Sequence, residues 1–164
     1  MRDRALGFGV AAGVFALDQL SKWFVLAPLR LREVQVVELL PFFRFWYTEN
    51  NGISLGLLNA QTAVGRWMLV GMTAAIAIAV AVWIGREKQR FDQIALGMVL
   101  GGALGNIIDR VRLGYVLDYA DLHFGDVHPF LVFNVGDAAI TIGVLLLLLR
   151  ALLTRDPKPA GKDK

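Results

Sequence analysis

The stretch LVFNVGDAAITIGVLLLLLRALL, residues 131–153, decides the fold of this chain. It is about as long and apolar as a helix must be to cross the hydrocarbon core of a bilayer, roughly 20 residues. The chain as a whole agrees, because 56% of its 164 residues are hydrophobic, 19% are charged and the mean hydropathy is +0.54. Soluble domains carry about 25% charged residues, and disordered, collagen-like or coiled-coil chains have other compositions again. The sequence therefore predicts an integral membrane protein.

Three other segments are also apolar and long enough to span a membrane, so we expect one integral membrane domain over residues 1–164. The first span follows the basic sequence MRDR, but its apolar run continues past Asp18 and Lys22 without a small-residue cleavage site, so we expect it to be retained. The predicted fold class is an all-α membrane protein, a bundle of four transmembrane helices. The expected spans are residues 5–29, 62–84, 94–111 and 131–153, followed by a disordered cytoplasmic tail at 154–164.

Glycines recur every fourth position in two of the spans. Gly97, Gly101 and Gly105 do so in the third span, and Gly9 and Gly13 do so in the first. This spacing puts small residues on one helix face and lets a neighbouring helix approach closely. We expect both sets to lie in helix–helix contacts.

Basic residues are distributed unequally between the two sides of the predicted bundle. Connections rich in Lys and Arg stay on the cytoplasmic side of a membrane. The connection after the first span carries Arg30, Arg32 and Arg44, and residues 113–130 carry no Lys or Arg. We therefore expect both chain ends to be cytoplasmic. The side with the chain ends carries Arg2, Arg4, Arg86, Lys88, Arg90, Arg150, Arg155, Lys158, Lys162 and Lys164.

The two connections on the other side contain more than a linker needs. Residues 34–48, VQVVELLPFFRFWYT, are rich in β-branched and aromatic residues, which predicts a short pair of strands on the membrane surface. In residues 113–130, Asp118 has apolar neighbours and is not expected at a solvated loop tip. Asp121 and Asp126 have polar or turn-like neighbours, so we expect both to be solvated surface charges.

Polar side chains of three spans gather at the outer boundary of the predicted bundle. With a rise of 1.5 Å per residue, Asp18 and Lys22 lie roughly 21–27 Å along the first helix from Arg4. They are four residues apart and share a helix face, so we expect a structural ion pair. Ionisable groups inside spans are costly and mark functional sites. The other polar residues at this level are Asn106, Asp109 and Arg110, which close the third span, and Asn134 and Asp137, which open the fourth.

Three carboxylates at this depth are candidates for chemistry: Asp109, Asp118 and Asp137. Two carboxylates within about 3 Å share one proton, so one can activate water while the other donates to a peptide carbonyl. This is aspartic proteolysis, which needs no metal or other cofactor. Arg110 is placed to hold a substrate carbonyl or to offset a carboxylate charge. The residues alone do not decide which two carboxylates pair, and a proton relay would use the same groups.

The composition restricts other chemistry. The chain has no Cys, which excludes a thiolate nucleophile or metal ligand, and its two His, His123 and His128, are interpreted as interfacial residues. Ser21 and Ser54 have no evident base partner. Two other classes stay open. A transporter or proton-conducting bundle should carry polar residues in both leaflets, and a non-catalytic scaffold would use them only to join helices.

Five motifs occur in order along most of the chain: D-Q-x-x-K (Asp18, Gln19, Lys22), N-x-G-x-S-L (Asn50, Gly52, Ser54, Leu55), G-N-x-x-D-R (Gly105, Asn106, Asp109, Arg110), V-x-D (Val116, Asp118) and F-N-x-G-D (Phe133, Asn134, Gly136, Asp137). Each is weak alone, but the ordered set on a chain with four spans is specific. The set resembles the bacterial lipoprotein signal peptidase (signal peptidase II) family.

The resemblance implies a small extracytoplasmic β-cradle on the four-helix bundle, and removal of signal peptides from bacterial prolipoproteins just before the diacylglyceryl-modified cysteine. It assigns Asp118 and Asp137 as the catalytic dyad, without metal or other cofactor, and leaves Asp18 and Lys22 as a structural pair. It implies a multi-pass protein of the bacterial cytoplasmic (inner) membrane with its active site near the outer leaflet. Expected partners are lipid-modified prolipoproteins and membrane lipids but no nucleic acid, and we expect a monomer. Residues implied to bind substrate or brace the site are Asn50, Gly52, Asn106, Asp109, Arg110 and Asn134.

Two positions depart from the family pattern. Leu55 stands where the family usually has Phe, and Gly136 stands where Ala is usual. We expect Leu55 to reshape an apolar contact near the substrate and Gly136 to loosen the packing beside Asp137. Neither change removes a reacting group.

Overall fold

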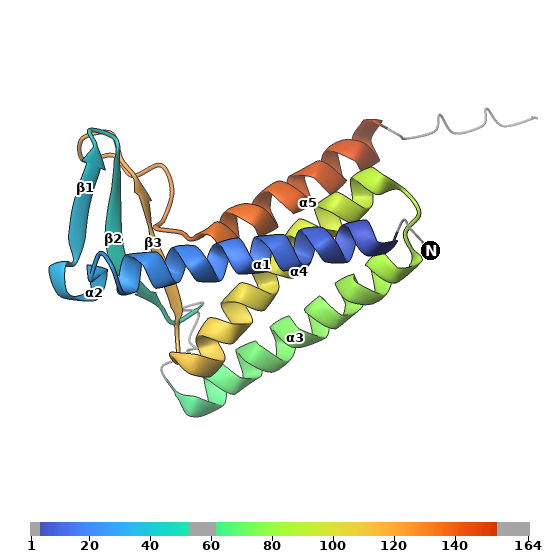
Figure 1. Ribbon diagram of the computed structural model, residues 1–164, viewed down its shortest axis with the longest axis horizontal. Coiled ribbons are helices and arrows are strands. Elements are labelled where there is room, and N and C mark those ends of the chain that lie inside the picture. Colours follow the sequence, from blue (N-terminus) through green and yellow to red (C-terminus); the bar gives the residue numbers. More distant parts are fainter. Residues whose placement is uncertain (1–3, 53–61, 154–164) are drawn as a thin grey trace, which may run out of the picture.

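The computed structural model describes residues 4–52 and 62–153, so the predicted tail at 154–164 and the predicted contact of Leu55 lie outside the described residues. Within the described ranges, four long helices form a bundle (Figure 1), and each is long and apolar enough to cross a membrane. The predicted fold class is confirmed. The long helices are α1 (Arg4–Leu26), α3 (Ala63–Arg86), α4 (Arg90–Arg112) and α5 (Val135–Leu153).

Several helix ends differ from the predicted spans, including the start of α4 at Arg90 in place of residue 94, and two of the differences have local reasons. Helix α1 ends at Leu26, because Ala27 precedes a proline and is driven away from helical conformation. Helix α5 begins at Val135 because Asn134 caps it: Asn134 Oδ1 accepts a hydrogen bond from the N–H of Asp137 at 2.9 Å. In return Asp137 Oδ2 accepts one from the N–H of Asn134 at 3.3 Å, which makes a reciprocal capping box.

Helix α4 contacts all three other long helices and is the most buried of the four. A Cβ atom at Gly101 would lie 2.5 Å from the carbonyl oxygen of Ala11, so a glycine is needed for α1 to approach α4 this closely. Gly97 and Gly105 face α1 in the same way. The predicted contact surface on α4 is therefore confirmed.

The prediction for the glycines of the first span is wrong. A Cβ atom at Gly9 or Gly13 would meet no atom within 4 Å, so neither glycine supports a close helix contact. The two share the right spacing but lie on another face of α1. The α1 residues that meet the glycines of α4 are Gly7, Val10, Ala11, Val14 and Asp18.

A three-stranded antiparallel sheet closes one end of the bundle (Figure 1). Strands β1 (Val36–Leu40) and β2 (Phe43–Asn50) form the hairpin that the composition of residues 34–48 predicts. The third strand, β3 (Val116–Leu122), was not predicted and lies within the connection after α4. The sheet meets the bundle where α1 ends and α5 begins, and the short helix α2 (Leu31–Val34) lies at the same end.

The sheet is fastened to the bundle by a small apolar core. Val25 of α1 and Leu31 of α2 are buried against Leu117 and Tyr119 of β3. The hydroxyl of Tyr119 also donates a hydrogen bond to Ser21 Oγ at 2.6 Å. These contacts fix β3 on the C-terminal end of α1, and with it the residues on either side of Tyr119.

Candidate active site

Asp118 is a buried carboxylate in the middle of β3, with 2% of its surface exposed. Both of its oxygens accept hydrogen bonds from side-chain amides, Oδ2 from Asn50 at 2.9 Å and Oδ1 from Asn134 at 2.6 Å. Burial raises the pKa of Asp118 to about 7, and the negative charge of Asp137 adds to the effect. The two amide hydrogen bonds act in the opposite direction but do not outweigh burial. Asp118 is thus a carboxyl that exchanges its proton near neutral pH.

Asp137 lies in the first turn of α5 and is joined to Asp118 through a single residue. The side-chain amide of Asn134 donates to Asp118, while its backbone N–H donates to Asp137 Oδ2 at 3.3 Å. The other oxygen of Asp137 accepts from Asn106 Nδ2 at 2.7 Å. The cap of α5 therefore holds one carboxylate and presents an amide to the other.

The expected pair of Asp18 and Lys22 is present and extends to a third charge. Lys22 Nζ lies 2.7 Å from Asp18 Oδ2 and 2.8 Å from Asp109 Oδ2, and all three side chains are almost fully buried. Lys22 also donates to Asn106 Oδ1 at 3.3 Å. Asp109 further accepts from the backbone N–H of Leu117 at 3.2 Å. This carboxylate is thus occupied by Lys22 and by the start of β3, which sets it apart from Asp118 and Asp137.

Arg110 lies beside the two remaining carboxylates. Its guanidinium interacts electrostatically with Asp137 and Asp118 and donates to the carbonyl oxygen of Asn106 at 3.4 Å. Its Nε atom is buried and has no hydrogen-bond partner within the described part of the chain. Arg110 therefore has one guanidinium N–H that no described residue accepts.

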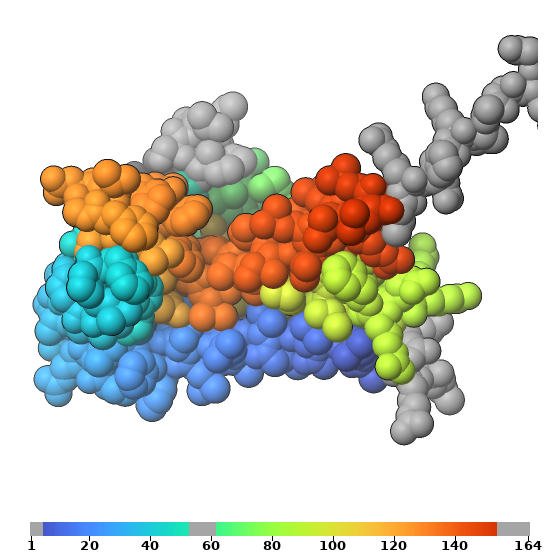
Figure 2. Space-filling model, turned by 90° about the horizontal axis from the view of Figure 1, so that it is seen from above, coloured from blue at the N-terminus to red at the C-terminus, as the bar shows by residue number. Residues whose placement is uncertain are grey.

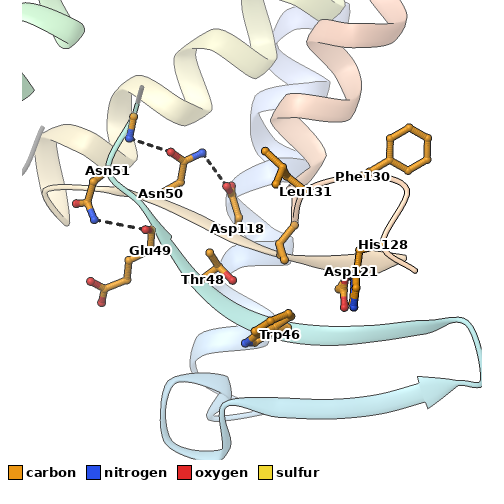
Figure 3. A pocket seen from close by; sticks show the side chains of 12 residues that line it. Trp46, Thr48, Glu49, Asn50, Asn51, Asp118, Asp121, His128, Phe130 and Leu131 are labelled. Carbon is orange, nitrogen blue, oxygen red and sulfur yellow. Dashed lines mark hydrogen bonds and ion pairs between the residues drawn. The ribbon is translucent and has the colours of Figure 1, made fainter. Parts of the chain in front are cut away.

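A pocket of about 550 Å³ lies beside Asp118, lined by β2, β3 and the connection that follows β3 (Figure 3). Asn50 lies on its wall, and Gly52 orients it: the Gly52 N–H donates to Asn50 Oδ1 at 2.9 Å, which leaves Asn50 Nδ2 to face Asp118. Gly52 has a φ of 90°, a conformation that side chains disfavour. The pocket is lined by Trp46, Thr48, Glu49, Asn50, Asn51, Gly52, Asp118, Asp121, His128, Phe130, Leu131 and Val132.

The prediction that Asp121 is a solvated surface charge is wrong. Only 1% of its surface is exposed, and its carboxylate contacts Arg44 Nε at 2.7 Å and His128 Nδ1 at 3.0 Å. Burial by itself would raise the pKa of Asp121, but the hydrogen bonds from His128 and Arg44 outweigh it and lower the pKa. The sequence neighbours of Asp121 did not indicate its partner, because Arg44 is brought next to Asp121 by the pairing of β2 with β3. Asp126 is exposed, as predicted.

Gly136 does not loosen the packing beside Asp137, contrary to expectation. A Cβ atom there would lie 3.0 Å from both Asn134 Oδ1 and the carbonyl oxygen of Gly102. The Gly136 N–H also donates to Asp18 Oδ1 at 2.8 Å. In this chain the glycine permits a close crossing of α4 and α5 directly below the first turn of α5.

The structure thus brings Asp118, Asp137, Asn50, Gly52, Asn106, Arg110 and Asn134 to one place and ties Asp18, Lys22 and Asp109 together beside it. Asp121 and His128, which line the same pocket, were missed as site residues. Four apolar helices capped by a sheet that carries a buried carboxyl beside a second carboxylate define a membrane peptidase of the aspartic class.

Comparisons with known proteins agree with this class. The family model described as "Signal peptidase (SPase) II" matches residues 10–153. The lipoprotein signal peptidase of Rhizorhabdus wittichii is 59% identical over 160 residues, which cover 98% of this chain and 93% of that protein. That of Sphingopyxis alaskensis is 54% identical over 154 residues, covering 93% of this chain and 89% of the relative.

Solved structures agree as well. Two bacterial membrane enzymes, determined by the in meso method, resemble the fold with TM-scores of 0.77 and 0.76, at 28% and 30% identity. They cover 96% and 92% of this chain, and 94% of each solved chain is matched. The chain belongs to the signal peptidase II family. The resemblance seen in the five motifs is confirmed, and with it the predicted activity, that of an aspartic signal peptidase.

Proposed function

We propose that Asp118 and Asp137 are the catalytic pair of this lipoprotein signal peptidase. The substrate is a lipid-modified prolipoprotein, cut just before its diacylglyceryl-modified cysteine. The observation that carries the assignment is the bridge through Asn134, which donates to Asp118 Oδ1 at 2.6 Å and to Asp137 Oδ2 at 3.3 Å. Asp109, the other carboxylate at this level, is neutralised by Lys22 at 2.8 Å and has no comparable freedom.

The chemistry follows from one proton shared by two carboxyl groups. The ionised carboxylate removes a proton from water as the water oxygen attacks the scissile carbonyl carbon, and the protonated carboxyl donates to the carbonyl oxygen. The tetrahedral intermediate then breaks its C–N bond: the leaving nitrogen takes the proton that came from water, and the hydroxyl formed from the carbonyl oxygen returns its proton to the carboxylate that donated it. The raised pKa of Asp118, about 7, supplies the protonated carboxyl at neutral pH. Arg110 stabilises the negative charge that develops on the carbonyl oxygen.

The location of the pair suits a substrate that is held in a membrane. The sheet and the pair lie at one end of the bundle, whereas the start of α1, the α3–α4 connection and the end of α5 lie at the other (Figure 1). By sequence, the two chain ends and the connection between the second and third spans carry ten of the 17 Lys and Arg residues, which supports a cytoplasmic position for both chain ends. The site then faces the outer leaflet of the bacterial cytoplasmic membrane, where a lipidated cysteine anchors its chain. Nothing in this mechanism requires a second copy of the chain, so we propose a monomer surrounded by membrane lipids.

Purified Asp118→Asn and Asp137→Asn variants test the assignment against the matched control Asp126→Asn. Asp126 is an exposed carboxylate in the connection after β3. We expect the two site variants to lose turnover of a lipidated prolipoprotein by at least 10³-fold, the scale of a lost general acid or base, while the control keeps the wild-type rate. Thermal unfolding in detergent establishes that each variant is folded. A folded site variant with a near-normal rate would overturn the pair and make Asp109 the next candidate.

A further inference from the structure

The connection between β3 and α5 forms one wall of the pocket. Figure 3 shows Leu131 on the opposite side of Asp118 from Asn50, with Phe130 next to it. In Figure 2 this connection forms a prominence beside β1 and β2. Phe130 and Leu131 are 62% and 92% exposed, large apolar side chains that line the pocket yet have little packed against them. They are therefore available to contact a bound substrate.

The connection is hydrogen-bonded to the rest of the chain through its backbone at its two ends, and a pair of backbone hydrogen bonds between Phe124 and Val127 closes a turn near its start. At the start, the N–H of His123 donates to the carbonyl oxygen of Phe42 at 3.0 Å. At the end, Phe133 exchanges backbone hydrogen bonds with Ala120 of β3. Among the described residues, no backbone hydrogen bond involves positions 129–132. The placement of these residues therefore depends on side chains.

His128 supplies the side-chain tie. Its Nδ1 atom lies 3.0 Å from Asp121 Oδ1, and its ring lies 6.3 Å from that of Trp46 and 5.9 Å from that of His123. Asp121 is a rigid anchor because it lies in β3, is almost fully buried and is held from the other side by Arg44 at 2.7 Å. Figure 3 shows His128 and Asp121 next to each other, on the far side of the pocket from Asn50.

We propose that His128 is a positioning residue for substrate binding: its hydrogen bond to Asp121 holds the segment 129–132 against the pocket, so that Phe130 and Leu131 contact the lipidated peptide. The inference rests on the proposed function, since it takes Asp118 as the reacting end of the same pocket. His128 has no hydrogen bond to Asp118, Asp137 or Asn134. Its loss should therefore weaken binding without slowing the chemical step.

The test compares His128→Ala and His128→Asn, with Asp126→Ala as a control in the same connection. Asn retains a donor near the position of Nδ1, whereas Ala removes it. We expect His128→Ala to raise KM about tenfold, the scale of one hydrogen bond to a charged group, with kcat changed less than twofold. His128→Asn should restore most of the wild-type KM, and Asp126→Ala should match wild type.

A binding measurement separates this inference from the proposed function. In an Asp118→Asn background, the Kd for an uncleaved lipidated peptide should rise about tenfold on adding His128→Ala. If Asp118→Asn remains active, the catalytic pair is wrong, whatever His128 does. If the KM of His128→Ala is unchanged, or kcat falls instead of KM rising, the positioning role is wrong. Should His128→Ala fail to fold, the comparison of His128→Asn with His128→Gln decides. Equal substrate binding by both would overturn the role, because Gln places its donor one carbon farther out.

Discussion

Replacing Asp118 with Asn should stabilise the protein at alkaline pH even as it removes activity. Burial raises the pKa of Asp118 from 3.8 to about 7, so the folded protein keeps a proton that the unfolded chain loses at much lower pH. The folded state therefore binds more protons than the unfolded state between pH 4 and 7, roughly, and its stability falls as pH rises through this window. Asn carries no charge at any pH, so the variant escapes this loss.

The magnitude follows from the width of that window. Each pH unit over which the folded state holds one extra proton costs about 1.4 kcal/mol. Between pH 5 and pH 8 about two such units are crossed, so wild type loses about 3 kcal/mol relative to the variant. For a chain of this size 1 kcal/mol moves Tm by about 2–4 °C, so the difference in Tm should widen by about 6–12 °C. Asn50 and Asn134 both donate to Asp118, so an amide there faces one mismatched donor, but that penalty is independent of pH.

The assay is thermal unfolding of both proteins in the same detergent at pH 5, 6, 7 and 8. The quantity of interest is the change with pH in the difference between the two Tm values, which cancels the titration of groups that do not interact with Asp118. Asp126→Asn, an exposed substitution, is the matched control and should show a constant difference. The Tm of Asp118→Asn minus the Tm of wild type should rise with pH. If this difference stays constant or falls as pH rises, Asp118 is not a buried carboxyl that is protonated near neutral pH.

Two further substitutions test what holds the bundle together. Lys22→Met should lower the free energy of unfolding by about 3–5 kcal/mol, because it leaves two buried carboxylates without their cation. The yield and Tm of the folded protein should fall, whereas Lys88→Met, at an exposed position, should leave both unchanged. Equal Tm values for the two variants would contradict the charge network. Gly101→Ala should cost about 1–3 kcal/mol by forcing a methyl group against the Ala11 carbonyl, while Gly13→Ala should gain about 0.5–1 kcal/mol from helix propensity alone. Equal shifts in Tm for the two glycines would mean that the α1–α4 contact is not as close as described.

The parts of this fold that the sequence predicts are those set by local periodicity. The four spans follow from hydropathy, and the common depth of the polar residues follows from the fixed rise of a helix. Spacing also indicates that Gly97, Gly101 and Gly105 share a face. It does not indicate what that face meets, which is why Gly9 and Gly13, with identical spacing, were wrongly assigned to a contact.

What could not be predicted depends on pairing between distant segments. Strand β3 is short and its pairing with β2 joins residues about 70 positions apart, for example Thr48 with Asp118. Without that register, Asp121 has no visible partner, since Arg44 belongs to the other strand. The residues alone made Asp118 one of three candidate carboxylates, and the motif resemblance selected it together with Asp137. The resemblance gave no signal for Asp121 or His128, which lie outside the five motifs.

The polar residues that join the helices and those that form the site are one connected network, so the scaffold and enzyme interpretations of them do not exclude each other. Lys22 binds Asp18, and Asp18 Oδ1 accepts from the backbone N–H of Gly136, at 2.7 Å and 2.8 Å. Gly136 directly precedes Asp137, so the ion pair of α1 fixes the first turn of α5 from below. That same turn is capped by Asn134, which orients both carboxylates. On the proposed assignment of Asp118 and Asp137, Asp18 and Lys22 support catalysis by holding the start of α5 in place, without taking part in the chemistry.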